Sequence, residues 1–228
     1  MDLENRILFE DNHLIIINKK AGELVQGDKT GDKTLADKIK HYIKQRDNKP
    51  SAVYLGIVHR LDRPTSGVVA FAKTSKALSR LNNQFKSRVP KKVYWAIVNK
   101  DFLKNKGSLI HWMTRNKKQN KSKAHKHEVP NSKIAHLNFK RIYELNNYCV
   151  LEILLETGRH HQIRAQLSKE GFPIHGDLKY GAKRSNLDGS ISLHARQLSI
   201  EHPVTKKNIC FTAKPMEVGI WRSVLFYL

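Results

Sequence analysis

Short apolar blocks alternate with polar connections along the whole chain, and this pattern predicts a protein built mainly from strands. Apolar runs of this length, bounded by residues that form turns, are typical of strands in a sheet. Two longer segments alternate on either side of Asn146 and Asn147, which predicts a β-hairpin there. The segments predicted as strands are 7–9, 14–17, 54–58, 68–72, 92–98, 135–143, 148–156, a short one near 174, 192–200 and 208–212.

Only a few segments show the spacing of an amphipathic helix. One begins near Thr34, one begins near Ser75, one spans about 160–169, and the segment 216–226 closes the chain. Because many strands are combined with so few helices, we predict an α+β fold, with a mixed, largely antiparallel β-sheet core and flanking helices. No linker rich in Gly, Ser or Pro divides the chain, so we expect a single catalytic domain over residues 1–228.

Charge narrows the choice of partners. The 228 residues include 42 Lys and Arg but 20 Asp and Glu, which gives a formal net charge of +22. Such an excess attracts polyanions, namely RNA, DNA or an anionic membrane surface, although it can also serve solubility alone. The stretch 115–127 holds six Lys or Arg, two His and no acid, which predicts an exposed basic loop.

The compartment follows from what the sequence lacks. No apolar run approaches the roughly 20 residues that cross a bilayer, and the first residues lack the basic-then-apolar order of a signal peptide. Two cysteines exclude a disulfide framework and a Cys-rich zinc site. We therefore expect a cytoplasmic protein with no membrane partner.

The segment 59–67 is the most informative for chemistry. A predicted strand ends there in a polar loop in which Asp62 stands between Arg60 and Arg63, and Pro64 restricts the backbone. Nearby positive charge favours an ionised carboxylate, which can act as a nucleophile or a general base. The alternative is a structural turn in which the neighbouring cations merely neutralise Asp62.

The segment 157–167 leads from a predicted strand into a predicted helix. On that helix Ile163 and Leu167 share one face, and His160 and Arg164 share another, so an apolar platform for a base would lie beside a guanidinium. The two adjacent histidines diverge on a helix, which argues against a metal site. We predict instead that they form hydrogen bonds or contact phosphate.

Cations and aromatic residues are interleaved in the segment 91–95. On a strand Lys92 and Tyr94 project from the same face, so the ring could stack on a base while the amine meets a phosphate. The alternative is a half-buried strand with Tyr94 in the core.

Several motifs of the chain, taken in order, resemble those of the RluA-type RNA pseudouridine synthases. The segment 59–67 resembles the signature H-R-L-D-x-x-T-S-G of that family, and 92–94 resembles its K-x-Y element. Residues 158–164 match G-R-x-H-Q-I-R, and residues 176–181 match G-D-x-x-Y-G. The chain departs from the family at 19–22, where Lys-Lys-Ala-Gly replaces the usual Lys-Pro-Ala-Gly. The resemblance extends over about residues 6–215.

The resemblance implies that Asp62 is the catalytic carboxylate, that Tyr94 packs against the target ring, and that Arg164 pairs with Asp62 and keeps it ionised. It also implies that a flipped uridine sits above an apolar floor, and that cations hold the surrounding RNA. The residues implied in these contacts are Arg60, Lys92, Arg159, Ile163 and Leu167.

The implied function is the isomerisation of uridine to pseudouridine in structured RNA, either ribosomal or transfer RNA. The target base has to leave its stack, and no redox change or external group is involved, so we expect no cofactor. We also expect a monomer, without the N-terminal S4-type RNA-binding domain of some members. The alternatives are a non-catalytic RNA-binding or assembly factor that retains the fold, and an enzyme acting on DNA or free nucleotides.

Overall fold

The computed structural model describes residues 3–27, 31–102 and 104–226. Contacts divide the chain into two compact units. The first unit comprises residues 1–91 and 195–214, and the second comprises residues 92–194 and 215–228. The expectation of a single catalytic domain stays a prediction, and each unit is described by itself below.

The first unit is built on a largely antiparallel sheet. Strand β1 (Ile7–Glu10) pairs with β2 (Leu14–Lys19), which pairs with β4 (Ser66–Ala72). Strand β4 also pairs with the short β3 (Gly56–Ile57) and neighbours β10 (Leu193–Glu201), whose other partner in this unit is β11 (Asn208–Thr212). A 3-10 turn, η1 (Glu4–Arg6), precedes the sheet.

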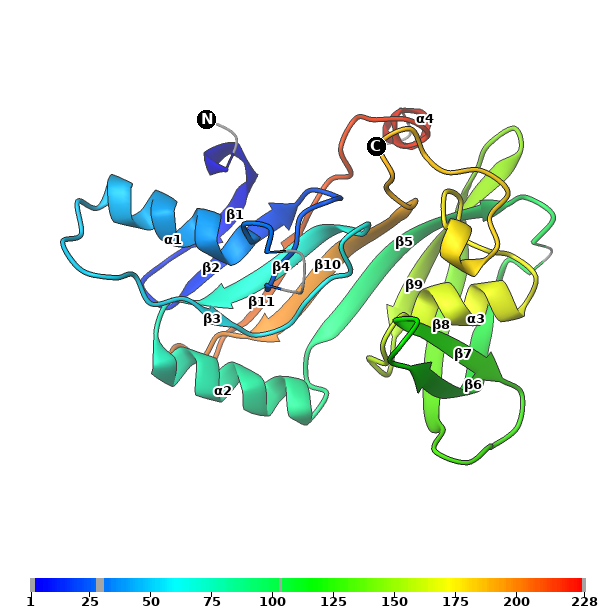
Figure 1. Cartoon of the computed structure of the whole chain (residues 1–228), viewed down its shortest axis with the longest axis horizontal. Coiled ribbons are helices and arrows are strands. Elements are labelled where there is room, and N and C mark those ends of the chain that lie inside the picture. The colour runs from blue at the N-terminus through cyan, green and yellow to red at the C-terminus, as the bar shows by residue number, and fades with distance from the viewer. Residues whose placement is uncertain (1–2, 28–30, 103, 227–228) are drawn as a thin grey trace. The chain divides into compact units, whose positions relative to one another are not determined.

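Two helices flank this sheet, and both begin where the sequence predicts (Figure 1). Helix α1 (Leu35–Arg46) follows Thr34, whose hydroxyl and backbone N–H form a capping box with Asp37. Helix α2 (Ser75–Lys86) follows Thr74, whose hydroxyl accepts from the N–H of Ala77. Every residue of β4 is buried, which explains its continuous apolar sequence.

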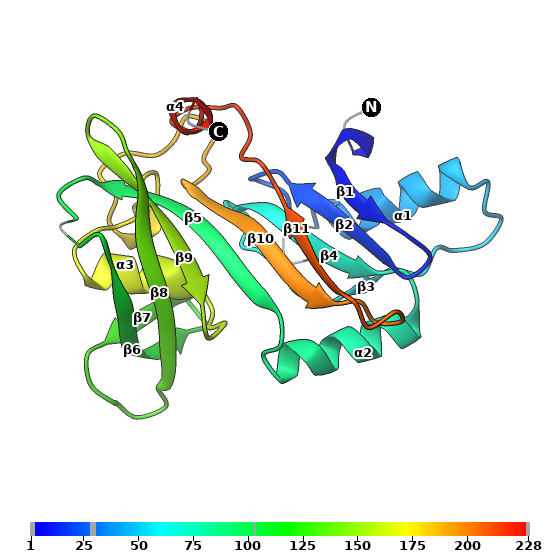
Figure 2. The same ribbon diagram turned by 180° about the vertical axis from the view of Figure 1, so that it is seen from behind.

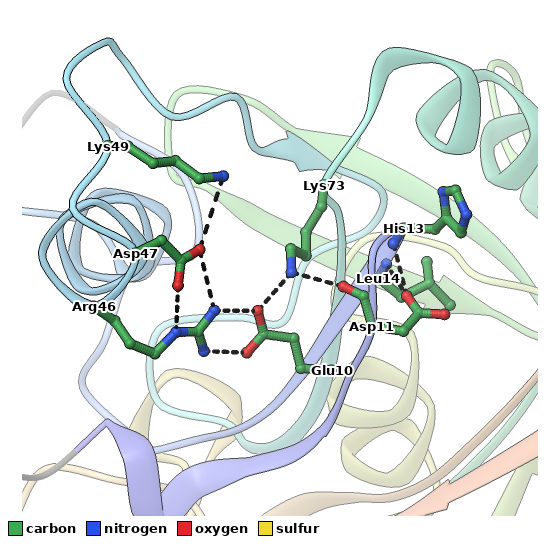
Figure 3. A network of polar contacts seen from close by, with 8 residues as sticks. All are labelled: Glu10, Asp11, His13, Leu14, Arg46, Asp47, Lys49 and Lys73. Atoms are coloured by element: carbon green, nitrogen blue, oxygen red, sulfur yellow. Dashed lines mark hydrogen bonds and ion pairs between the residues drawn. The ribbon is translucent and has the colours of Figure 1, made fainter.

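A polar network fixes α1 to the sheet of the first unit (Figure 3). The guanidinium of Arg46 donates to both carboxylate oxygens of Glu10 at 2.7 and 2.8 Å, and Lys73 donates to the same carboxylate at 2.6 Å. The pKa of Glu10 is lowered, chiefly by Arg46 and against the opposing effect of burial. The end of α1 is therefore held at the end of β1 by paired charges.

The second unit contains an antiparallel sheet in the order β5, β9, β8, β6, β7 (Figure 2). Helix α3 (Gln162–Lys169) covers one face, and a short helix α4 (Trp221–Leu225) covers part of the other. A 3-10 turn, η2 (Leu178–Tyr180), lies between them in the chain. The strands are β5 (Lys91–Asn99), β6 (Lys106–Asn116), β7 (Lys121–His125), β8 (Lys133–Glu144) and β9 (Tyr148–Leu155).

The α+β fold with a largely antiparallel sheet is confirmed, and so is the hairpin around Asn146 and Asn147, which joins β8 to β9. The strand expected over 54–58 shortens to the two residues of β3, and no strand forms near Ile174. Strand β6 was not predicted.

The prediction of a basic loop over 115–127 is wrong. Strand β6 ends at Asn116, residues 117–120 form a tight connection, and β7 follows, so most of the segment is a β-hairpin. Ser122 and Ala124 are buried while Lys121 and Lys123 are exposed. The strand period of two was therefore present, but small buried residues between lysines did not look like a core strand.

The two cysteines differ in exposure. Cys149 on β9 is fully buried, and burial raises its pKa, whereas Cys210 on β11 is exposed. In the described part of the chain, no helix has the length and apolar character needed to cross a membrane.

Candidate active site

The predicted site residues are distributed over both units. Arg60 and Asp62 belong to the first unit, on the connection between β3 and β4. The others belong to the second unit, on β5, on α3 or just before α3; these are Lys92, Tyr94, Arg159, Ile163, Arg164 and Leu167.

The loop that carries Asp62 is fixed to its own unit by a close backbone approach. Gly67 has φ +115°, and a Cβ at this position would lie 2.3 Å from the carbonyl oxygen of Ala195 on β10. Only glycine fits such a contact at such a dihedral. The Thr-Ser-Gly part of the motif therefore anchors the end of the loop where β4 begins.

A second set of contacts fixes the other side of the loop. The carbonyl oxygen of Arg63 accepts from the backbone N–H of Gly22 at 2.7 Å and from the ammonium of Lys19 at 3.2 Å. The Arg63 Nε donates back to the carbonyl of Gly22 at 3.0 Å, and Thr65 N–H donates to the main-chain carbonyl of Asp62 at 3.0 Å. The backbone on both sides of Asp62 is thus held by hydrogen bonds.

Lys19 is a functional candidate that the sequence reasoning missed. Its side chain is fully buried, and its ammonium also donates to the carbonyl of Lys20 at 2.9 Å. Burial lowers the pKa of Lys19 to about 7, against the favourable charges of Glu23 and Asp62. The Lys-Lys-Ala-Gly segment was the signal, but nothing in a single sequence says that its first lysine is buried.

The arginines beside Asp62 contact other groups as well. Arg63 forms an ion pair with Asp32 at 2.9 Å, and Arg60 is exposed, with one guanidinium nitrogen 3.5 Å from the amide oxygen of Gln26. Asp62 itself is half-buried. Arg60 is therefore placed where a large ligand can reach it.

In the second unit, the segment before α3 is shaped by Gln162. Its amide oxygen accepts from the hydroxyl of Thr157 at 2.8 Å and from the N–H of Arg159 at 2.9 Å. His161 adopts the left-handed conformation with φ 52°, and the helix begins only at Gln162. The expectation that His160 lies on a helical face with Arg164 is therefore wrong.

Arg164 forms a buried, bidentate ion pair with Asp177. The Arg164 Nε and Nη2 atoms donate to the two carboxylate oxygens at 2.7 and 2.8 Å, and both residues are at most 5% exposed. The guanidinium carbon also lies 4.9 Å from the ring centre of Tyr180. The Gly-Asp-x-x-Tyr-Gly motif thus supplies two partners of Arg164, and the predicted pairing with Asp62 stays a prediction.

The two histidines form hydrogen bonds. The rings of His160 and His161 stack with centroids 3.8 Å apart. His160 Nδ1 lies 2.9 Å from the Ser122 hydroxyl, and His161 Nδ1 lies 2.9 Å from the Tyr180 hydroxyl, which accepts from Ser122 N–H at 2.9 Å. Burial and the neighbouring Arg164 lower the pKa of His161 to about 2, so this ring is neutral.

This network joins the basic hairpin to the motif around α3. The Tyr180 hydroxyl thus links Ser122 of β7 to Nδ1 of His161. The β6–β7 hairpin is therefore part of the buried structure of the candidate site. Among the described residues, no group of three or more His, Cys, Asp or Glu side chains has the arrangement of a metal site.

Tyr94 and the predicted apolar floor lie together. Tyr94 is half-buried and packs against the apolar cluster that contains Ile163 and Leu167. Leu167 is fully buried, so it supports this surface from below. Lys92 reaches the turn before α3, with its ammonium 3.1 Å from the position that a Cβ on Gly158 would occupy.

Arg159, the last of the predicted contacts, is half-buried. Its Nε donates to the carbonyl of Ile134 on β8 at 3.0 Å. Arg159 and Lys92 thus both lie at the turn that leads into α3, and Tyr94 packs on the apolar cluster that includes Ile163.

Comparison with known proteins gives a consistent result. The family model described as RNA pseudouridylate synthase matches residues 13–169. The chain is 34% identical to ribosomal large subunit pseudouridine synthase C of Buchnera aphidicola, with 97% of this chain and 70% of the relative covered. It is 31% identical to ribosomal large subunit pseudouridine synthase D of Pseudomonas aeruginosa, with 96% and 71% covered.

A solved structure supports the fold. Human RNA pseudouridylate synthase domain containing 4 superposes with a TM-score of 0.76 over 94% of this chain and 90% of that chain, at 24% sequence identity. The resemblance stated from the motifs is therefore confirmed over most of the sequence. The chain belongs to the RNA pseudouridylate synthase family and is an isomerase that converts uridine in RNA to pseudouridine.

Proposed function

We propose that the chain modifies ribosomal RNA of the large subunit, with transfer RNA as the alternative substrate. Relatives at 31–34% identity carry the name of ribosomal large subunit pseudouridine synthases, and this supports the proposal. The net charge of +22 suits a structured polyanion. We further propose that the protein works in the cytoplasm as a monomer and has no membrane partner.

The observation that carries the catalytic assignment is the fixed loop around Asp62. A catalytic carboxylate needs a defined direction, and here hydrogen bonds hold the backbone at Arg63 and Thr65 while a glycine contact holds the start of β4. Arg164 is also held in one geometry, through Asp177. We assign catalysis to Asp62, Tyr94 and Arg164.

The reaction rearranges one nucleotide without gain or loss of atoms. The N1–C1′ bond breaks, the uracil turns, and a C5–C1′ bond forms, after which the proton on C5 leaves and N1 is protonated. Asp62 can attack C1′, attack C6 or remove a ribose proton, and each route needs an ionised carboxylate. The detached ring has to be retained, which is the role given to Tyr94 above Ile163 and Leu167.

The target uridine has to leave its stack before any of these steps. Unstacking costs a few kcal/mol, which contacts to the base and the phosphates offset. We assign Arg60 to the RNA at the flipped position, and Lys92 and Arg159 to phosphates beside it. The basic hairpin over 115–127 provides a more diffuse and salt-sensitive hold.

The substrate is identified by mapping pseudouridine in total RNA from cells with and without the gene. Purified protein should restore the missing modification in ribosomal RNA from the deletion strain. Restoration only in transfer RNA would overturn the substrate proposal.

The catalytic assignment is tested with Asp62→Asn, which should abolish conversion while RNA binding remains. The control is Asp101→Asn, at an exposed acid of the second unit, which should convert RNA normally. Undiminished activity of Asp62→Asn would contradict the role of Asp62. A wild-type protein that binds RNA without converting it would instead favour an assembly factor.

A further inference from the structure

One face of the sheet in the second unit carries a partly exposed apolar and aromatic cluster. Along β6 the positions alternate, so that Leu109 and Met113 are buried on the side of α3 while Ile110 and Trp112 point the other way. Figure 1 shows α3 in front of β8 and β9, and Figure 2 shows the same strands from behind. We call the side that faces away from α3, over β6, β7 and β8, the open face.

The register of the strands brings the cluster together. Trp112 lies opposite His125 on β7 and opposite Ile134 on β8, so it stands at the centre of a row across three strands. Ile110 lies opposite His136 in the next row. Ile110 is 56% exposed and Ile134 is 44% exposed, and Trp112 is half-buried.

Single exposed apolar residues need no explanation, but an exposed cluster around a tryptophan marks a binding surface. Farther along the same side of the sheet, Trp221 and Val224 of α4 pack against Trp95, Ile97 and Val150. Among the described residues no helix packs over the row of Trp112, and Ile110 and Ile134 remain exposed there. The open face is therefore the part of this side that the chain leaves available.

Charge indicates the chemistry of the partner. Strands β6 and β7 contain no acid, and the one acid of β8 is its last residue, Glu144. Two acidic side chains reach this side of the sheet, both from β9 or the residue that follows it: Glu152 lies opposite Lys140, and Glu156 accepts from the amide of Asn138 at 2.9 Å. The exposed lysines on the open face are Lys106, Lys123 and Lys140, whereas the ammonium of Lys121 lies 5.2 Å from the ring centre of Tyr180 on the side of α3.

We propose that the open face binds unpaired nucleotides of the substrate RNA, outside the site of isomerisation. One base stacks on Trp112 beside His125 and Ile134, and a neighbouring phosphate meets Lys123. This inference rests on RNA as the substrate, which is part of the proposed function. A second copy of the chain is disfavoured as the occupant, because the exposed lysines of this face outnumber its carboxylates and two such faces would repel each other.

The edge of the sheet offers a route for the RNA. Strand β7 stands at the end of the strand order, and no further strand pairs with it in the described part of the chain. Its exposed lysines alternate with the buried Ser122 and Ala124. A single strand that leaves a structured element can therefore cross β7 and continue over Trp112.

Affinity is measured by anisotropy of a labelled RNA stem with a single-stranded extension, and of the same stem without it. Base stacking on an aromatic side chain contributes about 1–3 kcal/mol, so Trp112→Ala should weaken binding of the extended RNA about 5- to 150-fold. Trp112→Phe should recover most of this loss, since a phenyl ring also stacks. The blunt stem should bind all three proteins with closely similar affinity.

Two controls separate stacking from folding and charge. Leu187→Ala removes a fully exposed apolar side chain from another loop of the second unit and should not change binding. Lys123→Gln should weaken binding of the extended RNA and reduce the salt slope by about one, whereas Lys183→Gln, at an exposed lysine elsewhere, should weaken it less.

The outcomes of this test are independent of those for the catalytic assignment. If Trp112→Ala binds the extended RNA like the wild type, the open face is not an RNA surface, even if Asp62→Asn abolishes activity. If the wild type sediments as a dimer and Trp112→Ala as a monomer with unchanged RNA affinity, the face is a contact between copies and the proposal is wrong. If the wild type converts no RNA, but Trp112→Ala still binds the extended RNA more weakly than the wild type, the proposed function is wrong and the RNA-binding role of the open face is supported.

Discussion

The buried pair of Arg164 and Asp177 allows a quantitative test of how the second unit is held together. Replacing Arg164 by Met removes two hydrogen bonds of 2.7 and 2.8 Å and leaves the Asp177 carboxylate, which is 1% exposed, without this partner. Breaking a buried pair in this way destabilises a protein by about 3–5 kcal/mol, because the remaining charge stays buried. Arg164→Met should lower the free energy of unfolding of the second unit by that amount.

The double variant Arg164→Met with Asp177→Asn distinguishes the loss of the ion pair from the cost of leaving the Asp177 carboxylate buried without its partner. Because it contains no unpaired buried charge, it should be more stable than Arg164→Met alone, by about 1–2 kcal/mol or more. Arg164→Lys keeps the positive charge but cannot form the bidentate hydrogen bonds. Its free energy of unfolding should therefore lie between those of Arg164→Met and the wild type.

The assay is urea denaturation followed by tryptophan fluorescence. All three tryptophans belong to the second unit, so their emission reports on this unit and not on the first. Arg184→Met, at an exposed position of the same unit, is the control and should change stability by no more than about 0.5 kcal/mol. A loss below about 1 kcal/mol for Arg164→Met, or a double variant as unstable as the sum of the single variants, would refute the reasoning.

Three further predictions concern the loop of the first unit and the network of the second. Gly67→Ala should reduce soluble folded protein strongly, because its Cβ would lie 2.3 Å from the carbonyl oxygen of Ala195; circular dichroism and limited proteolysis measure this. Burial holds the pKa of Lys19 at about 7 instead of 10.5, so between these values the unfolded chain binds the extra proton and stability should rise with pH. Urea titrations should show this rise in the wild type but not in Lys19→Met. Tyr180→Phe leaves two buried polar groups without the hydroxyl and should cost about 1–3 kcal/mol, with hydrogen exchange speeding up in β7 relative to β1.

The pattern of apolar residues predicted most of the strands, both long helices and the α+β class, because buried strands such as β4 are continuous apolar runs. It failed at β6, and it failed at β7, where lysines alternate with the buried Ser122 and Ala124. A polar strand that packs small residues under a helix has the composition of a loop, so only the alternation of exposed and buried positions indicates a strand.

The candidate site shows the same division between local and distant information. The motifs located Asp62, Tyr94 and Arg164, because each motif is local in sequence. The partner of Arg164 lies thirteen residues away, across the end of a helix and a turn, and no local pattern specifies that contact. The buried Lys19 was missed because lysine is among the residues least expected inside a protein.

Because the two cysteines differ in exposure, one of them can be labelled selectively in the natural sequence. Cys149 is buried and its pKa is raised, so a maleimide at neutral pH should modify Cys210 alone. Cys210 belongs to the first unit, while every tryptophan belongs to the second. A dye on Cys210 that accepts energy from tryptophan therefore allows energy transfer between the two units to be measured in the natural sequence. A change in the distance between them can then be followed while RNA binds and is released.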